Sequence, residues 1–181
     1  RRQAEVKAKL DGMHVGDKVS KYVGGVWDMI VGPGNLFVAL AKKFVYGTVA
    51  IDCLAGPSEV VVLADKNARP EHIAADLIAQ AEHDPDAVPM LITTSAALLD
   101  QVDQELRLQL ETLPSRAVAE QALKNGFAIE VASLEEAREL SESIAPEHLE
   151  LLLQNASAHA SDFRTYGAIF IGSNSAEVFG D

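Results

Sequence analysis

The sequence predicts an α/β protein of three layers, an incomplete Rossmann-like, mostly parallel sheet with helices on both faces. Short runs rich in β-branched residues alternate with longer segments of helical periodicity, the order that produces a parallel sheet. Val60 to Leu63 is one such run, and it lacks the polar alternation of a half-exposed strand. We therefore expect it to be buried on both faces, within a sheet of about five or six strands from residue 58 onward.

Residues 1–57 are expected to stand apart from the domain that follows. The stretch before residue 26 is polar and weakly periodic, whereas the residues after it show the patterns of regular structure. The expected elements are a short helix over 3–10, a strand over 26–31 and a helix over 36–45. Gly47 follows the second helix and is expected to stop it.

Residues 58–181 are expected to form an α/β domain. Pro70 suits the first turn of a helix, and Ser133 with Glu136 forms the capping box that starts another. The expected helices cover 70–83, 96–112, 116–125, 134–144 and 156–163. Gly126 is expected to end the third of them. The expected strands cover 60–63, 88–94, 127–131 and 168–171, the last of them buried, and residues 149–153 are apolar.

The charge and the cysteine content exclude several classes of protein. The net charge of −12 argues against nucleic-acid binding, because that binding depends on basic contacts to phosphates. Residues 1–21 hold six basic against three acidic residues, a net +3, which leaves −15 on the remainder. The single cysteine, Cys53, rules out an internal disulfide framework and a multi-cysteine zinc site.

The hydropathy pattern predicts a protein that works away from membranes. Hydrophobic residues make up 48% of the chain and charged residues 23%, ordinary values for a soluble globular protein. No apolar run reaches the ~18–20 residues of a membrane span. No apolar segment of a signal peptide follows Arg1 and Arg2. We expect a cytoplasmic protein, or a plastid one if the source is a plant.

The expected helix over 70–83 places an amide and an imidazole one turn apart near its end. Its apolar residues cover an arc of about 140°, and Gln80 falls just beyond one edge of that arc. Gln80 is therefore expected to be half-buried, with His83 pointing the same way at the helix end. The pair could hold a metal ion; alternatively, Gln80 caps a neighbouring strand and His83 caps its own helix.

Glu147 and His148 form a second candidate segment, directly after Pro146. Proline biases Ala145 away from the helix and fixes the turn, so the two side chains are expected on a rigid corner. A carboxylate beside an imidazole is a workable general acid/base pair, because burial can move either pKa. The alternative is a solvated loop without a chemical role.

Two glycine-containing turns precede expected elements. The sequence GPGN at 32–35 stands between a strand and a helix, where backbone N–H groups and the helix dipole favour a phosphate. It departs from the full dinucleotide fingerprint, because Phe37 stands in place of the third glycine. Ser58, in AGPSE at 55–59, is placed for a ligand or for a local backbone hydrogen bond. A plain turn explains GPGN at least as well as a phosphate site, and AGPSE is likewise a turn before a strand.

Four motifs occur in order and at suitable separations: GPGNxFVxxAK, VxIDxxAGPSEV, AADLxxQAEHD and APEHLEL. Together they resemble the histidinol dehydrogenase family over roughly residues 26–181. The resemblance implies a zinc-dependent oxidoreductase of histidine biosynthesis. Such an enzyme oxidises L-histidinol to L-histidine with two molecules of NAD.

The resemblance also implies that residues 1–57 are the remnant of a dinucleotide-binding lobe and that the α/β domain over 58–181 carries the substrate and metal residues. It implies roles for particular residues as well. Glu147 and His148 match the catalytic acid/base pair of the family, and Asn35 matches a contact to the dinucleotide. The zinc ligands of the family correspond to three residues here, Gln80, His83 and Asp181. The implied substrate contacts are Ser58, Gln80, His83, His148 and Asp181.

The family's chemistry implies how these residues would act. Zinc would hold the imidazole and the amine of the substrate and so orient it. His148 would take the alcohol proton while hydride passes to the nicotinamide. Glu147 would then activate water for attack on the aldehyde. The family is homodimeric, and its C-terminal residues reach into the site of the partner subunit.

The chain departs from the family pattern in two places. A Gly-Gly-Ala-Gln-Ala segment is absent, and Val23-Gly24-Gly25 runs straight into Val26. The family's C-terminal glutamate and histidine, the latter a fourth zinc ligand, are also absent. We therefore expect a partial chain, lacking an N-terminal and a C-terminal portion, that has no turnover alone and in which zinc and NAD can both be missing.

Three hypotheses remain. The chain is a piece of histidinol dehydrogenase, a non-catalytic α/β binding or assembly module derived from that enzyme, or a structural α/β domain whose motifs are relics. We adopt the first and expect a homodimer or self-association, because loss of part of the cofactor-binding lobe exposes apolar surface. The first hypothesis requires Gln80, His83, Glu147 and His148 to converge on one cleft beside the carboxyl edge of the sheet.

Overall fold

The computed structural model describes residues 29–32, 36–54 and 56–176. Asn35, Asp181, the helix expected over 3–10 and the start of the strand expected over 26–31 lie outside these residues. The chain divides into two compact units, Arg1–Gly56 and Pro57–Asp181. None of the helices in the described ranges combines the length and the apolar character needed to cross a membrane.

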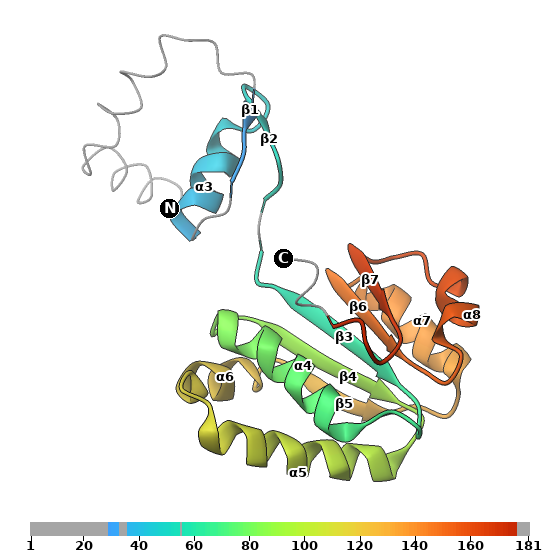
Figure 1. Ribbon diagram of the computed structural model, residues 1–181. Coiled ribbons are helices and arrows are strands. Elements are labelled where there is room, and N and C mark those ends of the chain that lie inside the picture. Colours follow the sequence, from blue (N-terminus) through green and yellow to red (C-terminus); the bar gives the residue numbers. More distant parts are fainter. Residues whose placement is uncertain (1–28, 33–35, 55, 177–181) are drawn as a thin grey trace. The chain divides into compact units, whose positions relative to one another are not determined.

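The described residues of the first unit form a two-stranded parallel sheet and one helix (Figure 1). Strand β1 (Met29–Ile30) pairs with β2 (Ala50–Ile51), and helix α3 (Leu36–Val45) lies between them in the chain. Gly47 has a φ of +92°, which glycine adopts freely, so the predicted stop after the helix is confirmed. Strand β2 is absent from the sequence prediction because two residues give no periodic signal.

The second unit is built on a five-stranded sheet in which every neighbouring pair is parallel. The strands lie in the order β5-β4-β3-β6-β7 (Figure 1). They are β3 (Glu59–Ala64), β4 (Val88–Thr93), β5 (Phe127–Glu130), β6 (His148–Leu152) and β7 (Ala168–Ile171). The predicted α/β fold with a parallel sheet is therefore confirmed.

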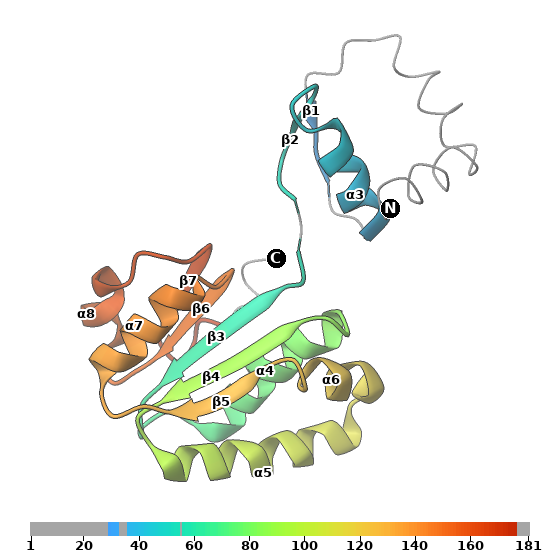
Figure 2. The ribbon, with the colours of Figure 1, turned by 180° about the vertical axis from the view of Figure 1, so that it is seen from behind.

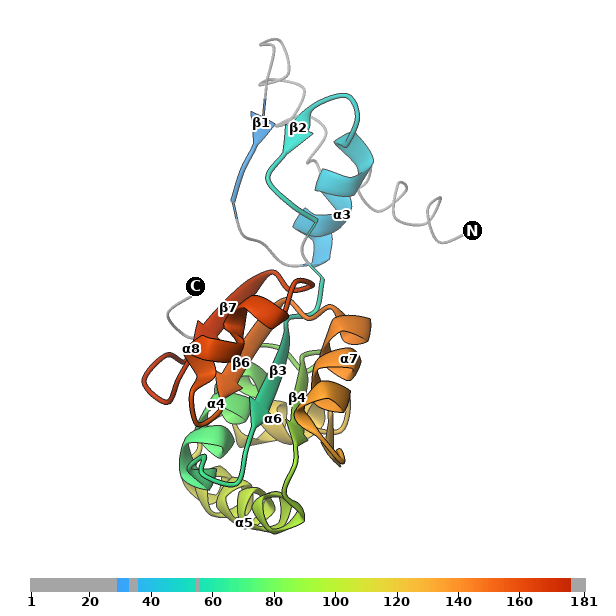
Figure 3. The ribbon, with the colours of Figure 1, turned by 90° about the vertical axis from the view of Figure 1, so that its right-hand side faces the viewer.

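Helices cover both faces of this sheet, as the views from behind and from the side show (Figure 2, Figure 3). On one face lie α4 (Pro70–His83), α5 (Ala96–Thr112) and α6 (Arg116–Ala122). On the other face lie α7 (Leu134–Ile144) and α8 (Ala156–His159), which continues as a 3-10 turn over Ala160–Asp162. The predicted three layers are present.

Strand β3 forms the centre of the core. Val60 belongs to an apolar cluster with Ile73 of α4, whereas Val61 belongs to a cluster with Ala137 of α7. Successive residues therefore face opposite layers. Residues 60–63 are at most 1% exposed, which confirms that this strand is buried on both faces.

The two edge strands are less buried than the centre. Phe127 and Ile129 of β5 are 42% and 40% exposed. All four residues of β7 are half-buried, so the prediction of a buried last strand is wrong. The reason is its position, because β7 lies at the end of the sheet with β6 on one side.

Gly126 has a different role from the predicted one. Helix α6 ends at Ala122 rather than at residue 125, so Gly126 does not terminate it. A Cβ atom at Gly126 would lie 1.7 Å from the carbonyl oxygen of Pro89, which is impossible. Glycine is required there because the chain entering β5 passes close to the backbone of β4.

Ser133 caps helix α7 as predicted. Its Oγ accepts a hydrogen bond from the N–H of Glu136 at 3.2 Å. The Glu136 carboxylate accepts the N–H of Ala132 at 2.8 Å, one residue earlier than in a complete capping box. The start of α7 is therefore fixed by side chains that the sequence identifies.

Candidate functional site

The predicted site residues that the structure describes in the second unit lie at the amino edge of the sheet and not at its carboxyl edge. His148 is the first residue of β6, and Ser58 directly precedes β3. Helix α4 follows β3 and runs back across the sheet, so Gln80 and His83 return to the edge where the strands start. The predicted location is therefore wrong, because the helix that connects two parallel strands runs antiparallel to them.

A cavity of about 330 Å³ lies at the opposite, carboxyl edge. Asp65, which follows β3, His72 of α4 and Gln154, which follows β6, are among its lining residues. None of the predicted site residues in the described ranges lines it.

Gln80 and His148 come into contact from elements far apart in the sequence. The Nδ1 atom of His148 lies 3.4 Å from Oε1 of Gln80. With the amide in this orientation, its oxygen accepts the hydrogen bond and Nδ1–H of the ring donates it. In a neutral ring this leaves Nε2 without a proton, so Nε2 can act as a base.

Both of these side chains are buried. Gln80 is 1% exposed and His148 is 9% exposed. Gln80 is thus fully buried and not half-buried as predicted, because α4 packs against α5 and α6 as well as against the sheet. A buried amide requires hydrogen-bonding partners, and His148 provides one of them.

The ring of His148 is fixed by the strands around it. Its backbone pairs with Val60 of β3 and with Ala168 of β7. The ring of Phe170 meets it edge to face, with the ring centroids 5.7 Å apart. An imidazole held in this way keeps one orientation, as a positioned base requires.

The predicted corner before β6 is present. Helix α7 ends at Ile144, and Ala145 adopts the left-handed conformation with φ 54° and ψ 58°. Pro146 is buried, whereas Glu147 is exposed. The carboxylate of Glu147 is therefore accessible to a ligand, while the next residue is held in the strand.

His83 and Ser58 lie at the same amino edge. His83 is the last residue of α4 and is exposed. Ser58 is half-buried, and its carbonyl oxygen accepts the N–H of Val88 at 3.0 Å. Asn35 and Asp181 lie outside the described residues, so their roles stay predictions.

The donors for a metal ion are incomplete in the described part of the chain. That part contains no group of three or more His, Cys, Asp or Glu side chains that could hold a metal. Gln80 and His83 supply an amide oxygen and an imidazole one turn apart on α4. A catalytic zinc usually has three protein ligands, so this pair fits part of such a site.

Two acids near this contact, Glu150, which is buried, and Asp76, which is half-buried, are not predicted from the sequence. Glu150 of β6, two residues after His148, is 0% exposed, and Asp76 lies one turn before Gln80. Burial raises the pKa of Asp76, and its hydrogen bond to Glu150 and the nearby charge of His72 oppose that rise. The available signal was an acid at position 150 within an apolar run.

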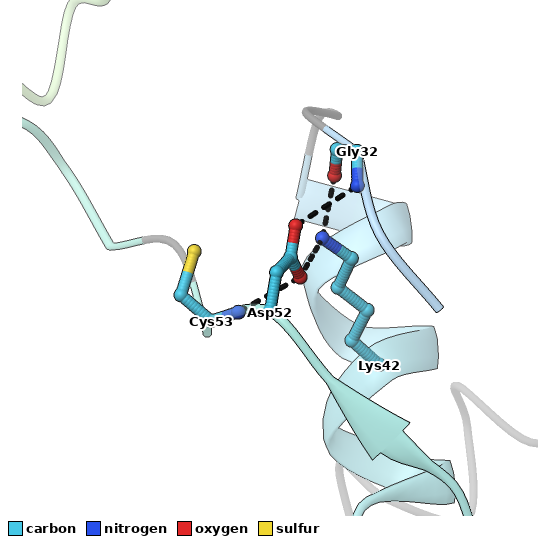
Figure 4. Close-up of polar contacts among 4 residues, drawn as sticks. All are labelled: Gly32, Lys42, Asp52 and Cys53. Atoms are coloured by element: carbon cyan, nitrogen blue, oxygen red, sulfur yellow. Dashed lines mark hydrogen bonds and ion pairs between the residues drawn. The ribbon is translucent and has the colours of Figure 1, made fainter. Parts of the chain in front are cut away.

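The first unit holds a ring of polar contacts around Gly32 (Figure 4). Lys42 is 6% exposed, and its Nζ lies 2.6 Å from Oδ1 of Asp52 and also donates to the carbonyl of Gly32. Asp52 Oδ2 accepts the N–H of Gly32 at 2.9 Å. The N–H of Gly32, the Lys42 ammonium and the N–H of Cys53 hold the pKa of Asp52 well below its usual range.

Comparison with known proteins relates the chain to one family. The family model described as histidinol dehydrogenase matches residues 20–181. A histidinol dehydrogenase from Synechococcus sp. is 54% identical over 155 residues, and one from Lactococcus lactis is 50% identical. Each match covers 85% of this chain and 36% of the relative, so the chain spans about a third of the length of these relatives.

A solved structure gives the same relationship. The crystal structure of histidinol dehydrogenase from Elizabethkingia anophelis matches with a TM-score of 0.82 and 42% sequence identity. The match covers 84% of this chain and 36% of that chain.

Proposed function

The chain belongs to the histidinol dehydrogenase family of oxidoreductases, and from this we propose that it carries part of a site that oxidises L-histidinol to L-histidine. Each turnover would reduce two molecules of NAD, first in forming the aldehyde and then in forming the carboxylate. The proposal concerns the complete enzyme, because the chain spans about a third of its relatives.

The observation that supports this proposal most strongly is the contact between Gln80 and His148. A buried amide and a buried imidazole lie 3.4 Å apart, next to an exposed carboxylate at Glu147. Oxidation of an alcohol needs an acceptor for its proton, and oxidation of an aldehyde needs an acceptor for a proton of water. We propose that His148 accepts the proton of the alcohol and that the adjacent Glu147 accepts the proton of water.

We propose that Gln80 and His83, with Asp181, hold zinc. The two described residues stand one helical turn apart, so their donors can face one ligand. When bound, the metal would supply a Lewis-acidic centre that binds the imidazole and the amine of the substrate. Ser58, at the same edge, is proposed to contact the substrate as well.

His148 is proposed to take the proton of the substrate alcohol. The hydrogen bond from its Nδ1 to Gln80 leaves Nε2 as the acceptor, and Phe170 limits rotation of the ring. The proton passes to Nε2 as hydride leaves the same carbinol group. Bound NAD would supply the acceptor for that hydride, and Asn35 is proposed to contact it.

Glu147 is proposed to act in the second oxidation. Its exposed carboxylate takes a proton from water as the oxygen bonds to the aldehyde carbon. The resulting anion of the hydrate would then lose hydride, for which bound NAD would again be the acceptor, to give the carboxylic acid, which releases its proton to become the carboxylate. Glu147 lies on the corner after α7, whereas His148 lies within β6, so each side chain can serve one step.

A chimeric enzyme tests the proposal. The 155-residue segment aligned in the Synechococcus relative is replaced by the corresponding segment of this chain. We expect this chimera to form NADH with L-histidinol, because the exchanged residues include Gln80, His83, Glu147 and His148. A chimera that folds and forms no NADH contradicts the proposed function.

The 181-residue chain alone is expected to form no NADH, because the described donors fall short of a catalytic zinc site. Robust turnover by the purified chain would overturn this expectation. The homodimer remains a further proposal, which the mass of the chain in solution tests by light scattering.

A non-catalytic binding or assembly module is the second candidate, favoured by the incomplete donor set. A zinc titration of the chain discriminates between the two. Binding that is lost in Gln80→Ala and His83→Ala, but not in His159→Ala, together with an inactive chimera, supports the module. Absence of binding together with an inactive chimera leaves a structural domain.

A further inference from the structure

The corner that carries Glu147 is held by the chain that enters β7. The N–H of Gly167 donates to the carbonyl of Pro146 at 3.0 Å, and the N–H of Ala168 donates to the carbonyl of Glu147 at 2.8 Å. Both carbonyl groups of the corner are therefore fixed by backbone hydrogen bonds. The position of the Glu147 backbone depends on where residues 167 and 168 lie.

Gly167 allows this close approach. A Cβ atom at this position would lie 2.6 Å from the carbonyl oxygen of Glu147 and 3.4 Å from its Cα. The neighbouring atoms are backbone, so a side chain at position 167 would displace the corner itself. Glycine is thus required by the contact with Glu147 rather than by its own dihedral angles.

The same segment is anchored to α7 by Glu142. One oxygen of its carboxylate accepts the N–H of Arg164 at 2.7 Å and the N–H of Thr165 at 3.2 Å. The other oxygen accepts the hydroxyl of Thr165 at 2.5 Å. The hydroxyl of Thr165 and the N–H of Arg164 lower the pKa of Glu142, which therefore stays ionised and keeps these bonds.

We propose that Glu142 and Gly167 are positioning residues for Glu147: Glu142 holds the loop over 164–165, and through Gly167 this loop holds the corner. The proposal rests on the proposed role of Glu147. It assigns a function to residues that do not reach the ligand site themselves. The carboxylate on α7 acts through the loop and two backbone hydrogen bonds.

The two predicted catalytic residues depend on this anchor to different degrees. His148 lies within β6, where it pairs with β3 as well as with β7. Glu147 precedes the strand and depends on the contacts of Gly167 and Ala168. Loosening the anchor should therefore slow the step assigned to Glu147 more than the step assigned to His148.

The test uses the chimeric enzyme and compares its two half-reactions. Rates are measured with L-histidinol and with the corresponding aldehyde, L-histidinal. We expect Glu142→Gln to slow aldehyde oxidation about tenfold and alcohol oxidation less than about threefold. Thr165→Val should act in the same way, whereas Thr165→Ser, which keeps the hydroxyl, should restore the aldehyde rate. Glu139→Gln, an exposed acid on the same helix, is the matched control.

Equal slowing of both half-reactions by Glu142→Gln would overturn the proposal, because it would indicate a general effect on folding. Unchanged rates would overturn it as well. Gly167→Ala is the second variant and should give the same selective loss.

Amide hydrogen exchange in the 181-residue chain separates this proposal from the proposed function. Glu142→Gln should make the amides of Gly167 and Ala168 exchange about tenfold faster, and Glu139→Gln should not. Unchanged exchange would overturn the anchor even if the chimera is active. An inactive chimera with accelerated exchange would overturn the role of Glu147 and leave the anchor intact.

Discussion

The Nδ1 atom of His148 lies 3.4 Å from Oε1 of Gln80, and the contact joins residues 68 positions apart. It ties the start of β6 to the last turn of α4 at the amino edge of the sheet. Both side chains are buried, so the contact combines a structural bond with a predicted chemical role.

Replacing Gln80 by alanine should destabilise the second unit. The substitution leaves a cavity and removes a hydrogen-bonding partner of the buried His148. We expect the free energy of unfolding in urea to fall by about 1–3 kcal/mol. Gln121→Ala, at an exposed position of α6, is the control and should change it by less than about 0.5 kcal/mol. Equal changes in the two variants would argue against a buried, bonded Gln80.

Asp76 should make the protein less stable as pH rises. Burial raises its pKa above the ordinary value of 3.8, so the folded state keeps this proton when the unfolded chain has lost it. The folded state then binds more protons than the unfolded chain. The free energy of unfolding therefore falls as pH rises from 3.8, and it stops falling once pH has passed the raised pKa. Asp76→Asn should remove this fall, as urea unfolding across this range would measure.

Asp100→Asn is the control for this pH dependence. Asp100 is exposed on α5, and its substitution should leave the fall in stability intact. A pH profile of Asp76→Asn that runs parallel to the wild-type profile would show that Asp76 does not cause the effect.

Replacing Lys42 by methionine should release Gly32. The substitution removes the ammonium that bonds both the carbonyl of Gly32 and the Asp52 carboxylate. We expect the amide of Gly32 to exchange with solvent about tenfold faster. Lys43→Met, at the exposed neighbouring position, should leave its exchange unchanged. Equal protection in both variants would mean that the ion pair does not hold this turn.

Gly126→Ala should be strongly destabilising. The new Cβ would collide with the carbonyl oxygen of Pro89, and the backbone of β4 or β5 would have to move. We expect a loss of about 2 kcal/mol or more in thermal or urea unfolding. Gly56→Ala meets no atom within 4 Å and is the matched control. A loss in Gly56→Ala as large as in Gly126→Ala would contradict the close approach.

The sequence predicts best the elements whose ends carry a local signal. The bounds of α3, α4 and α5 agree with the prediction, because apolar periodicity and residues such as Pro70 and Gly47 mark them. Helix α6 is shorter than predicted, because Gly126 does not mark a helix end. Glycine is needed there for the close approach to Pro89 of β4. The residues around a glycine do not indicate whether it contacts a distant strand.

The candidate site is predicted less completely, because its geometry depends on how distant elements pack. The sequence identifies Gln80 and His148 but places them at the wrong edge of the sheet. It predicts that Gln80 is half-buried, whereas the side chain is fully buried. The periodicity of one helix carries no information about α5 and α6, which pack against α4. No sequence motif predicts the hydrogen bonds of Glu142, because its partners lie on a loop after β6 that is distant in the sequence.

A histidine scan in the chimeric enzyme tests the location of the site most directly. His83 and His72 lie at opposite ends of α4, and His72 lines the cavity at the carboxyl edge. We expect His83→Ala and His148→Ala to lower kcat/KM for L-histidinol at least about a hundredfold, and His72→Ala and His159→Ala to change it by less than about threefold. A large loss in His72→Ala with activity retained in His83→Ala would place the chemistry at the carboxyl edge and contradict the proposed site.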